Sequence, residues 1–231
     1  ASDTVTITAK FTETMTATPT ISITGVVTNV LMNKTSGGLN TQLGADINGE
    51  LAADSFGFSV SLSSDGSRVA IGAPFNDEFG DDSGHIRIYD YTPSGTSSWT
   101  QVGDDIDGET ENEQSGRSVS LSSDGSRVAI GAMCYGLTSN SSTNQGCRGR
   151  VRIYELQSGN WVQLGVDIDA EADGDFNGVS VSLSSDGSRV AIGAHNNDGP
   201  TGNETSRGHV RIFDYTPSGT SSWTQVGGDI D

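Results

Sequence analysis

The chain has 231 residues, with 30 acidic and 12 basic side chains and a formal net charge of −18 at pH 7. So acidic a surface repels nucleic-acid phosphates and anionic lipid headgroups, which excludes nucleic acids as partners. No run reaches the roughly 18 to 20 consecutive apolar residues of a membrane-spanning helix, so we expect no membrane insertion.

Residues 1–40 differ from the rest of the chain. Thr4–Phe11 and Pro19–Gly25 alternate polar with apolar or small residues, as β-strands do, and Val27–Met32 is a third candidate strand. The pattern resembles the bacterial-type immunoglobulin-like modules of large surface proteins. It stops well short of a full module of roughly 100 residues, so the resemblance implies a partial, β-sandwich-like segment. Its completion requires strands from another chain or from residues outside this sequence, which makes the segment a candidate for strand exchange. The alternative is an extended arm packed on the first repeat.

From residue 41 onward the chain is built of repeats. The sequence SVSLSSDGSRVAIGA occurs at Ser59–Ala73, Ser118–Ala132 and Ser180–Ala194, so that its copies start 59 and 62 residues apart. A period of that length, with several strand-like runs inside it, is typical of β-repeat arrays.

Each repeat is predicted to hold four antiparallel strands. Ser59–Ser63 and Arg68–Gly72 are joined by a turn whose Asp65-Gly66 pair supplies the positive φ angles of a tight hairpin. His85–Asp90 is the third strand and Trp99–Gly103 the fourth. The equivalents in the later repeats are Arg150–Glu155 and His209–Asp214 for the third strand, and Trp161–Gly165 and Trp223–Gly227 for the fourth.

We therefore expect an all-β fold of three four-stranded blades of propeller type. Blade 1 occupies residues 41–103, blade 2 residues 104–165, and blade 3 residues 166–231, including the start of a fourth linker. Known propellers use about four to eight blades, so three form an incomplete ring. Either further blades lie beyond this chain, or blades from several chains assemble around or along one axis.

Three short sequence motifs carry a family resemblance. Phe56-Gly57, Gly72-Ala73-Pro74 and Gly84–Tyr89 resemble the FG-GAP repeat of integrin α-chain propellers and related surface proteins. All three motifs are complete only in the first repeat. In place of Phe-Gly, the second repeat has Ser115-Gly116 and the third has Asn177-Gly178. The resemblance implies a β-propeller of an extracellular protein. The DxDxDG calcium cage of that family is absent between the first two strands, so its metal site cannot be carried over.

The acidic linkers between blades are the candidate cation sites, because they place oxygen-bearing side chains at every second position. These residues are Asp46, Asn48 and Glu50, then Asp105, Asp107 and Glu109, then Asp167, Asp169 and Glu171. A hard cation such as Ca²⁺ binds several converging oxygens, so the pattern predicts calcium as a cofactor. The alternative interpretation is a solvated acidic turn that keeps the surface soluble.

Cysteines and glycosylation sequons indicate the compartment. Cys134 and Cys147 flank a short polar loop, which predicts a disulfide in an oxidising environment; two free thiols are the alternative. The sequons begin at Asn33, Asn140 and Asn203. Together these features favour an extracellular glycoprotein, secreted or on the cell surface.

Arginine and tryptophan recur at fixed positions in every repeat. Six arginines, Arg68, Arg127, Arg189, Arg87, Arg152 and Arg211, are expected to join blades by ion pairs with the acidic linkers. Trp99, Trp161 and Trp223 are expected to pack between blades. The alternative role for these tryptophans is stacking on glycans.

No catalytic motif is present, and near-identical repeats give carboxylate pairs the same environment three times, so we expect no enzymatic activity. His85 and His209 share a blade position with Arg150 and are interpreted as polar residues at a strand's start. The predicted function is a structural or adhesive repeat glycoprotein of a fibre, filament, appendage or matrix. It would self-associate, or join other chains, through blade faces and exchanged strands, stabilised by calcium. The alternative is a propeller lectin with one glycan site per blade.

Overall fold

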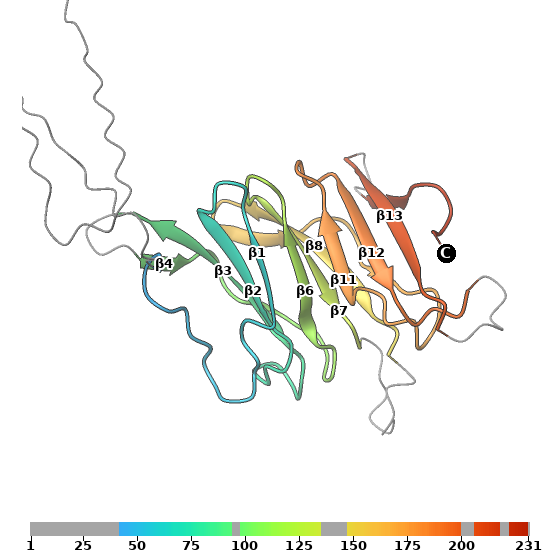
Figure 1. Ribbon diagram of the computed structural model, residues 1–231, viewed down its shortest axis with the longest axis horizontal. Coiled ribbons are helices and arrows are strands. Elements are labelled where there is room, and N and C mark those ends of the chain that lie inside the picture. The colour runs from blue at the N-terminus through green and yellow to red at the C-terminus, as the bar shows by residue number, and fades with distance from the viewer. Residues whose placement is uncertain (1–41, 94–97, 135–146, 200–205, 218–221, 231) are drawn as a thin grey trace, which may run out of the picture. The chain divides into compact units, whose positions relative to one another are not determined.

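The computed structural model describes residues 42–93, 98–134, 147–199, 206–217 and 222–230. Within these residues the regular elements are all β-strands and no helix occurs. The strands form three antiparallel sheets that follow one another in chain order, and none of them closes into a barrel (Figure 1). The predicted all-β fold with an incomplete ring of blades is confirmed. The strands predicted in residues 1–40 lie outside the described residues.

Each sheet places its four main strands side by side in chain order. Blade 1 contains β1 (Ser59–Leu62), β2 (Arg68–Ala73), β3 (His85–Thr92) and β4 (Ser98–Gln101). Blade 2 contains β6 (Ser115–Leu121), β7 (Arg127–Ala132), β8 (Arg150–Gln157) and β9 (Asn160–Gln163). Blade 3 contains β11 (Ser180–Leu183), β12 (Arg189–Ala194), β13 (His209–Thr216) and β14 (Ser222–Gln225).

The segment after each fourth strand adds a short fifth strand, where the sequence predicted only a linker. β5 (Ile106–Asp107) pairs with β3, and β10 (Ile168–Asp169) pairs with β8. In blade 3, Ile230 bridges to Val210 in the same place. Ile106 and Ile168 are buried in their blades. A run of two paired residues is too short for an alternating pattern to reveal it.

The hairpin at the head of each blade is closed by an aspartate. The Oδ1 atom of Asp65 accepts hydrogen bonds from the Ser63 hydroxyl at 2.7 Å and from the Ser67 backbone N–H at 2.9 Å. Gly66 follows with φ of 70°, a left-handed conformation that glycine adopts without strain. Asp124 and Asp186 make the same contacts in blades 2 and 3.

Apolar side chains fill the space between adjacent blades. Between blades 1 and 2 the buried cluster consists of Ala70, Ile86, Ile88, Ile106, Val119, Leu121, Val128 and Ile130. Between blades 2 and 3 it consists of Ala129, Val151, Ile153, Leu164, Ile168, Val190, Ile192, Phe213 and Trp223. Each fully buried side chain of this size contributes about 1.5–3 kcal/mol, so burial of apolar surface is what holds the blades together.

Adjacent blades contact each other backbone to backbone at glycine residues. A Cβ atom on Gly72 would collide with the carbonyl oxygen of Gly116, and one on Gly131 would collide with the carbonyl oxygen of Gly178. Serine hydroxyls complete the contact, because Ser59 Oγ donates to Gly116 O at 2.7 Å and Ser118 Oγ donates to Gly178 O at 2.8 Å. The absence of a side chain at Gly72 and Gly131 therefore sets how closely two blades approach.

The outer faces of blades 1 and 3 expose the same side chains that the inner interfaces bury. Val60 and Leu62 of β1 are 64% and 59% exposed, whereas their counterparts Val119 and Leu121 of β6 are 9% and 7% exposed. On the other side Val210 and Ile230 are exposed, although the equivalent residues of blades 1 and 2 are buried. Both ends of the array are thus unpaired interface halves.

Candidate functional site

Acidic side chains from two successive linkers meet at the start of the third strand. In blade 1 the meeting point is β3, where Arg87 Nη2 contacts Glu50 Oε1 and Asp105 Oδ2 at 2.6 Å each. Arg87 Nε adds a second bond to Asp105 Oδ2 at 2.8 Å. The predicted linker carboxylates therefore face third-strand side chains, and the prediction that arginine faces the acidic linkers is confirmed for Arg87.

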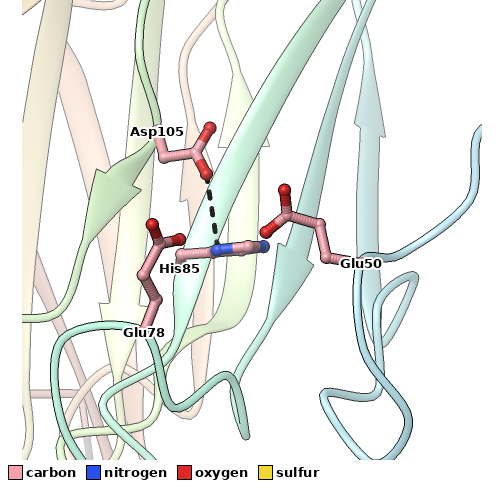
Figure 2. Close-up of side chains that lie close together, drawn as sticks. All are labelled: Glu50, Glu78, His85 and Asp105. Atoms are coloured by element: carbon pink, nitrogen blue, oxygen red, sulfur yellow. Dashed lines mark ion pairs between the residues drawn. The ribbon is translucent and has the colours of Figure 1, made fainter.

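His85 lies at the centre of this meeting point in blade 1. Its side chain is 1% exposed, and its Nδ1 atom lies 3.7 Å from Asp105 Oδ2 without a hydrogen-bond partner. One ligand atom from each of Glu50, Glu78, His85 and Asp105 falls within 4.8 Å of the others. Figure 2 shows the three carboxylates gathered around the imidazole. This group, which we call the blade 1 cluster, can hold a metal ion.

Burial favours a neutral histidine at this junction. Burial, together with the nearby Arg87 guanidinium, lowers the pKa of His85. Burial alone would raise the pKa of Asp105, but hydrogen bonds from Arg87 and Gln101 outweigh it and lower the pKa. The pKa of Asp107 is raised, first by burial and then by the negative charge of Asp105. Neutral imidazole is the form that binds metals.

Blade 2 replaces the histidine with Arg150. Its Nη1 atom contacts Glu109 Oε2 at 3.1 Å and Asp167 Oδ2 at 2.8 Å, and its Nε atom lies 3.3 Å from Asp169 Oδ1. These three acids correspond to Glu50, Asp105 and Asp107 of blade 1. A guanidinium thus occupies the position that an imidazole holds in blade 1.

A second arginine of blade 2 makes a fully buried ion pair. Arg152 Nη2 contacts Glu113 Oε1 at 2.6 Å, with the two side chains 2% and 0% exposed. The other oxygen of Glu113 accepts backbone N–H bonds from Glu109 and Thr110. Asp54 and Asp175 bind linker N–H groups in the same way in blades 1 and 3. The signal for this role was available, because each acid stands three residues before the glycine of the FG-type pair.

Blade 3 restores the histidine. His209 Nδ1 lies 3.9 Å from Glu171 Oε2 and 3.8 Å from Asp229 Oδ2, and these three residues form the second group that can hold a metal ion. Gly199 stands where blade 1 has Glu78, so this blade 3 cluster has one carboxylate fewer.

The sequence prediction of metal ligands and the two clusters overlap in part. Glu50, Asp105 and Glu171 are shared, whereas Glu78, His85, His209 and Asp229 were not predicted as ligands. The other predicted acids belong to neither of the two clusters found in the described part of the chain; these are Asp46, Asp107, Glu109, Asp167 and Asp169. Asp46 and Asn48 are exposed, and Asp46 accepts a hydrogen bond from Gln42. One calcium ion per linker stays a prediction.

The tryptophans lie at the blade interfaces. Trp161 Nε1 donates to Val102 O at 2.9 Å and Trp223 Nε1 donates to Leu164 O at 2.8 Å, each across to the preceding blade. Trp99 makes the same bond to Leu43 O at 3.0 Å and is half-buried. Trp161 and Trp223 therefore pack between blades, where their rings are part of the apolar clusters.

Cys134 and Cys147 form the predicted disulfide in the loop that follows β7. The sequon residues Asn33, Asn140 and Asn203 lie outside the described residues. No helix of the described part of the chain is long and apolar enough to cross a membrane.

This geometry defines an open array of propeller blades with a charged junction at each third strand. Residues 48–89 match the family model of the FG-GAP repeat. This stretch therefore carries an FG-GAP repeat, as the sequence predicted for the first repeat. No curated protein sequence matches the chain.

Solved structures give distant likenesses. One is a 6-phosphogluconolactonase-type protein of Bacteroides uniformis, with a TM-score of 0.46 and 13% identity over 73% of this chain and 39% of that one. Sqt1 of Saccharomyces cerevisiae has a TM-score of 0.44 and 13% identity over 76% of this chain and 36% of that one. The periplasmic gluconolactonase PpgL of Pseudomonas aeruginosa has a TM-score of 0.42 and 14% identity over 74% and 38%. The chain spans less than two fifths of each, and values this low carry no argument about function.

Proposed function

We propose that the chain is a non-enzymatic, extracellular structural or adhesive repeat protein that assembles head to tail with copies of itself. The observation that carries the proposal is the complementarity of its two ends. Blade 3 exposes the surface that blades 1 and 2 bury against the next blade in the chain. The exposed face of blade 1 presents the other half of that interface.

The internal interfaces specify the contacts that a joint between copies would reuse. Gly116 O covers Gly72 within the chain. At the ends, a Cβ built on Gly193 meets only Ser180 of its own blade among its nearest atoms, and one built on Gly57 meets no atom of the described residues within 4 Å. Leu121 N donates to Ser61 Oγ across the first interface, and Leu183 N donates to Ser120 Oγ across the second. The equivalents at a joint between copies are Ser182 of one copy as acceptor and Leu62 of the next as donor.

Assembly of two copies also requires that residues 42–48 of one copy be displaced. Residues 42–48 have the sequence QLGADIN, which repeats the end of each blade, and Gln42 bonds Asp46 as Gln225 bonds Asp229. Leu43 O already accepts the Trp99 bond that a preceding blade would otherwise accept. In the assembly, residues 226–230 of one copy take this place and residues 42–48 of the next are displaced. The joint is therefore an exchange of equivalent segments.

The test uses two blocked variants and light scattering behind a sizing column. Val60→Asp places a charge in the blade 1 face, and Val210→Asp places one in the blade 3 face. A head-to-tail joint predicts that the unmodified chain forms a defined oligomer, that each variant alone is monomeric, and that an equimolar mixture gives dimers, because each variant keeps one intact face.

Phe79→Asp is the matched control, since Phe79 is as exposed as Val60 but lies in a loop outside both faces. This variant should assemble like the unmodified chain. A chain that stays monomeric at all concentrations, or a mixture that stays monomeric, contradicts the proposal and would mean that other blades cover these faces.

We further propose that a divalent cation offsets repulsion among the linker carboxylates, with calcium as the ion that the linker sequence favours. The support for a divalent cation is the pair of acidic and histidine clusters that can hold a metal ion, whereas the support for calcium is the linker sequence alone. A fall in assembly mass on chelation is expected, and an unchanged mass contradicts this part.

Other support is chemical. The disulfide fits an oxidising compartment, and FG-GAP repeats are typical of extracellular proteins. No observation favours the lectin alternative, because two of its three candidate tryptophans face the neighbouring blade.

A further inference from the structure

Blades 1 and 2 solve one electrostatic problem in two ways. In blade 2 three carboxylates converge on the Arg150 guanidinium, whose charge they share. In blade 1 two of the equivalent carboxylates, Glu50 and Asp105, gather with Glu78 around His85, whose imidazole supplies no charge while it is neutral. The sequence position that carries a cation in one blade therefore carries a metal-binding side chain in the other.

Two polar atoms of blade 1 are buried without a partner at this point. They are His85 Nδ1 and Asp107 Oδ1, on residues that face each other across β3 and β5. A buried polar atom without a hydrogen bond destabilises the folded state. A metal ion held by the carboxylates would bind the His85 nitrogen and remove that cost.

We propose that the blade 1 cluster is a zinc site with His85, Asp105, Glu50 and Glu78 as its ligands. Four side chains that each offer one atom match the four-coordinate preference of Zn²⁺. All four belong to blade 1 and its flanking linkers in one chain, so the site does not depend on assembly.

The donor set favours zinc over calcium. Ca²⁺ takes six to eight oxygen ligands, whereas Zn²⁺ combines imidazole nitrogen with carboxylate oxygen. His85 is held in place by burial and by edge contact with the Phe56 ring, whose centroid lies 6.4 Å away. A fixed imidazole nitrogen within reach of three carboxylates is a poor site for a hard cation.

The surroundings orient the ligands and leave them accessible. Arg87 and Gln101 hold the Asp105 carboxylate, which still has lone pairs to spare, and such partners of a ligand strengthen metal binding. With Asp107 included, four acids face the single cation of Arg87, so the net local charge attracts a divalent ion. Glu50 and Glu78 are exposed to solvent, which gives the ion a path of entry.

Blade 3 provides a weaker second site. His209 faces Glu171 and Asp229, with no equivalent of Glu78. The unmodified chain should therefore bind two zinc ions, with the first tighter than the second.

The experiment is a titration of metal-free protein with Zn²⁺, followed by imidazole ¹⁵N NMR and by competition with a coloured chelator. The chain has three histidines, so each can be observed separately. We expect the His85 signal to shift first and the His209 signal second. His195, which stacks on Phe176 and belongs to neither cluster, should not shift and serves as the internal control.

Two variants test the ligands. His85→Arg reproduces the arrangement of blade 2, so the chain stays folded while zinc affinity at the tight site falls by ~100-fold. Glu78→Gln changes an exposed loop residue that does not affect folding and should lower affinity by ~10-fold. Unchanged zinc affinity in both variants, a shift of His195 instead of His85, or equal binding of calcium overturns the assignment.

Discussion

Blades 1 and 2 share one strand order and one 15-residue sequence, yet they stabilise their third-strand junctions by different means. In blade 2, Arg150 and Arg152 both form ion pairs with the linker acids, and a disulfide closes the loop. Blade 1 uses one arginine, a neutral histidine and a loop closed by hydrogen bonds. The difference shows that a β-repeat can keep its backbone while it exchanges an internal cation for a group of side chains that can hold a metal ion.

The largest expected effect comes from the buried pair of blade 2. Arg152→Met leaves Glu113 without its cation in a site with no solvent access, so the free energy of unfolding should fall by about 3–5 kcal/mol. Arg87→Met in blade 1 should cost only about 1–2 kcal/mol, because Glu50 and Asp105 reach water. Urea unfolding measures both. The double variant Arg152→Met/Glu113→Gln should recover part of the loss, and equal effects of the two single variants would contradict the comparison.

The disulfide sharpens the same contrast. It closes a loop with a sequence separation of 13, and loops of that size contribute about 3 kcal/mol through the unfolded chain. Cys134→Ser/Cys147→Ser should lower the free energy of unfolding by that amount in non-reducing buffer. In blade 1 the loop is held by Asn76, whose Nδ2 donates to Asp54 at 3.1 Å, so a reductant should leave that loop unaffected. Hydrogen exchange in the two loops, with and without reductant, distinguishes them.

The arginines after the hairpin turns compare an inner blade with an outer one. Arg127 Nη1 donates to Gly187 O of blade 3, and its guanidinium lies 5.4 Å from the Tyr215 ring centroid. Arg189 pairs with Asp214 of its own blade, and the described contacts show no following blade at that position. Arg127→Met should cost about 1–2 kcal/mol. Arg189→Met should leave the melting temperature of the monomer unchanged and should lower it only where copies assemble.

The smallest effect is common to all blades and concerns acid. Hydrogen bonds to the turn carboxylates, above all from the Ser67 backbone N–H to Asp65 and from the Ser184 hydroxyl to Asp186, lower the pKa of both residues to about 2. The unfolded value is near 3.8, so this stabilisation is complete above that pH and is lost as the pH falls toward 2. The triple variant Asp65→Asn/Asp124→Asn/Asp186→Asn should show a flatter dependence of unfolding free energy on pH in this range. An unchanged slope would mean that other groups dominate.

Repetition made the fold predictable. Three copies of one sequence with an Asp-Gly turn located the first two strands of every blade, and the spacing of tryptophan located the fourth. The fifth strands escaped prediction because Ile106 and Ile168 stand alone between aspartates, where two paired residues leave no periodic signal.

The candidate site was only half predictable. Linker acids were recognised from their spacing, but their partners depend on which side chains the sheet brings together. His85 meets Glu50 and Asp105 only because β3 runs between two linkers that are far apart in sequence. The sequence shows that His85, Arg150 and His209 occupy one blade position. Only the contacts of Arg150 with three carboxylates in the structure indicate that this position faces the linker acids.

The glycine contacts between blades also bear on how the chain finds its fold. Gly72 meets Gly116 and Gly131 meets Gly178 in the same way, with the same serine donors, so the backbone contact carries no information about which blade should follow which. During folding, a blade 3 that docks on blade 1 would find acceptable contacts, and misdocking of this kind is a characteristic trap for repeat proteins. The residues that distinguish one blade from the next, such as His85 and Arg150, then also determine which docking events persist.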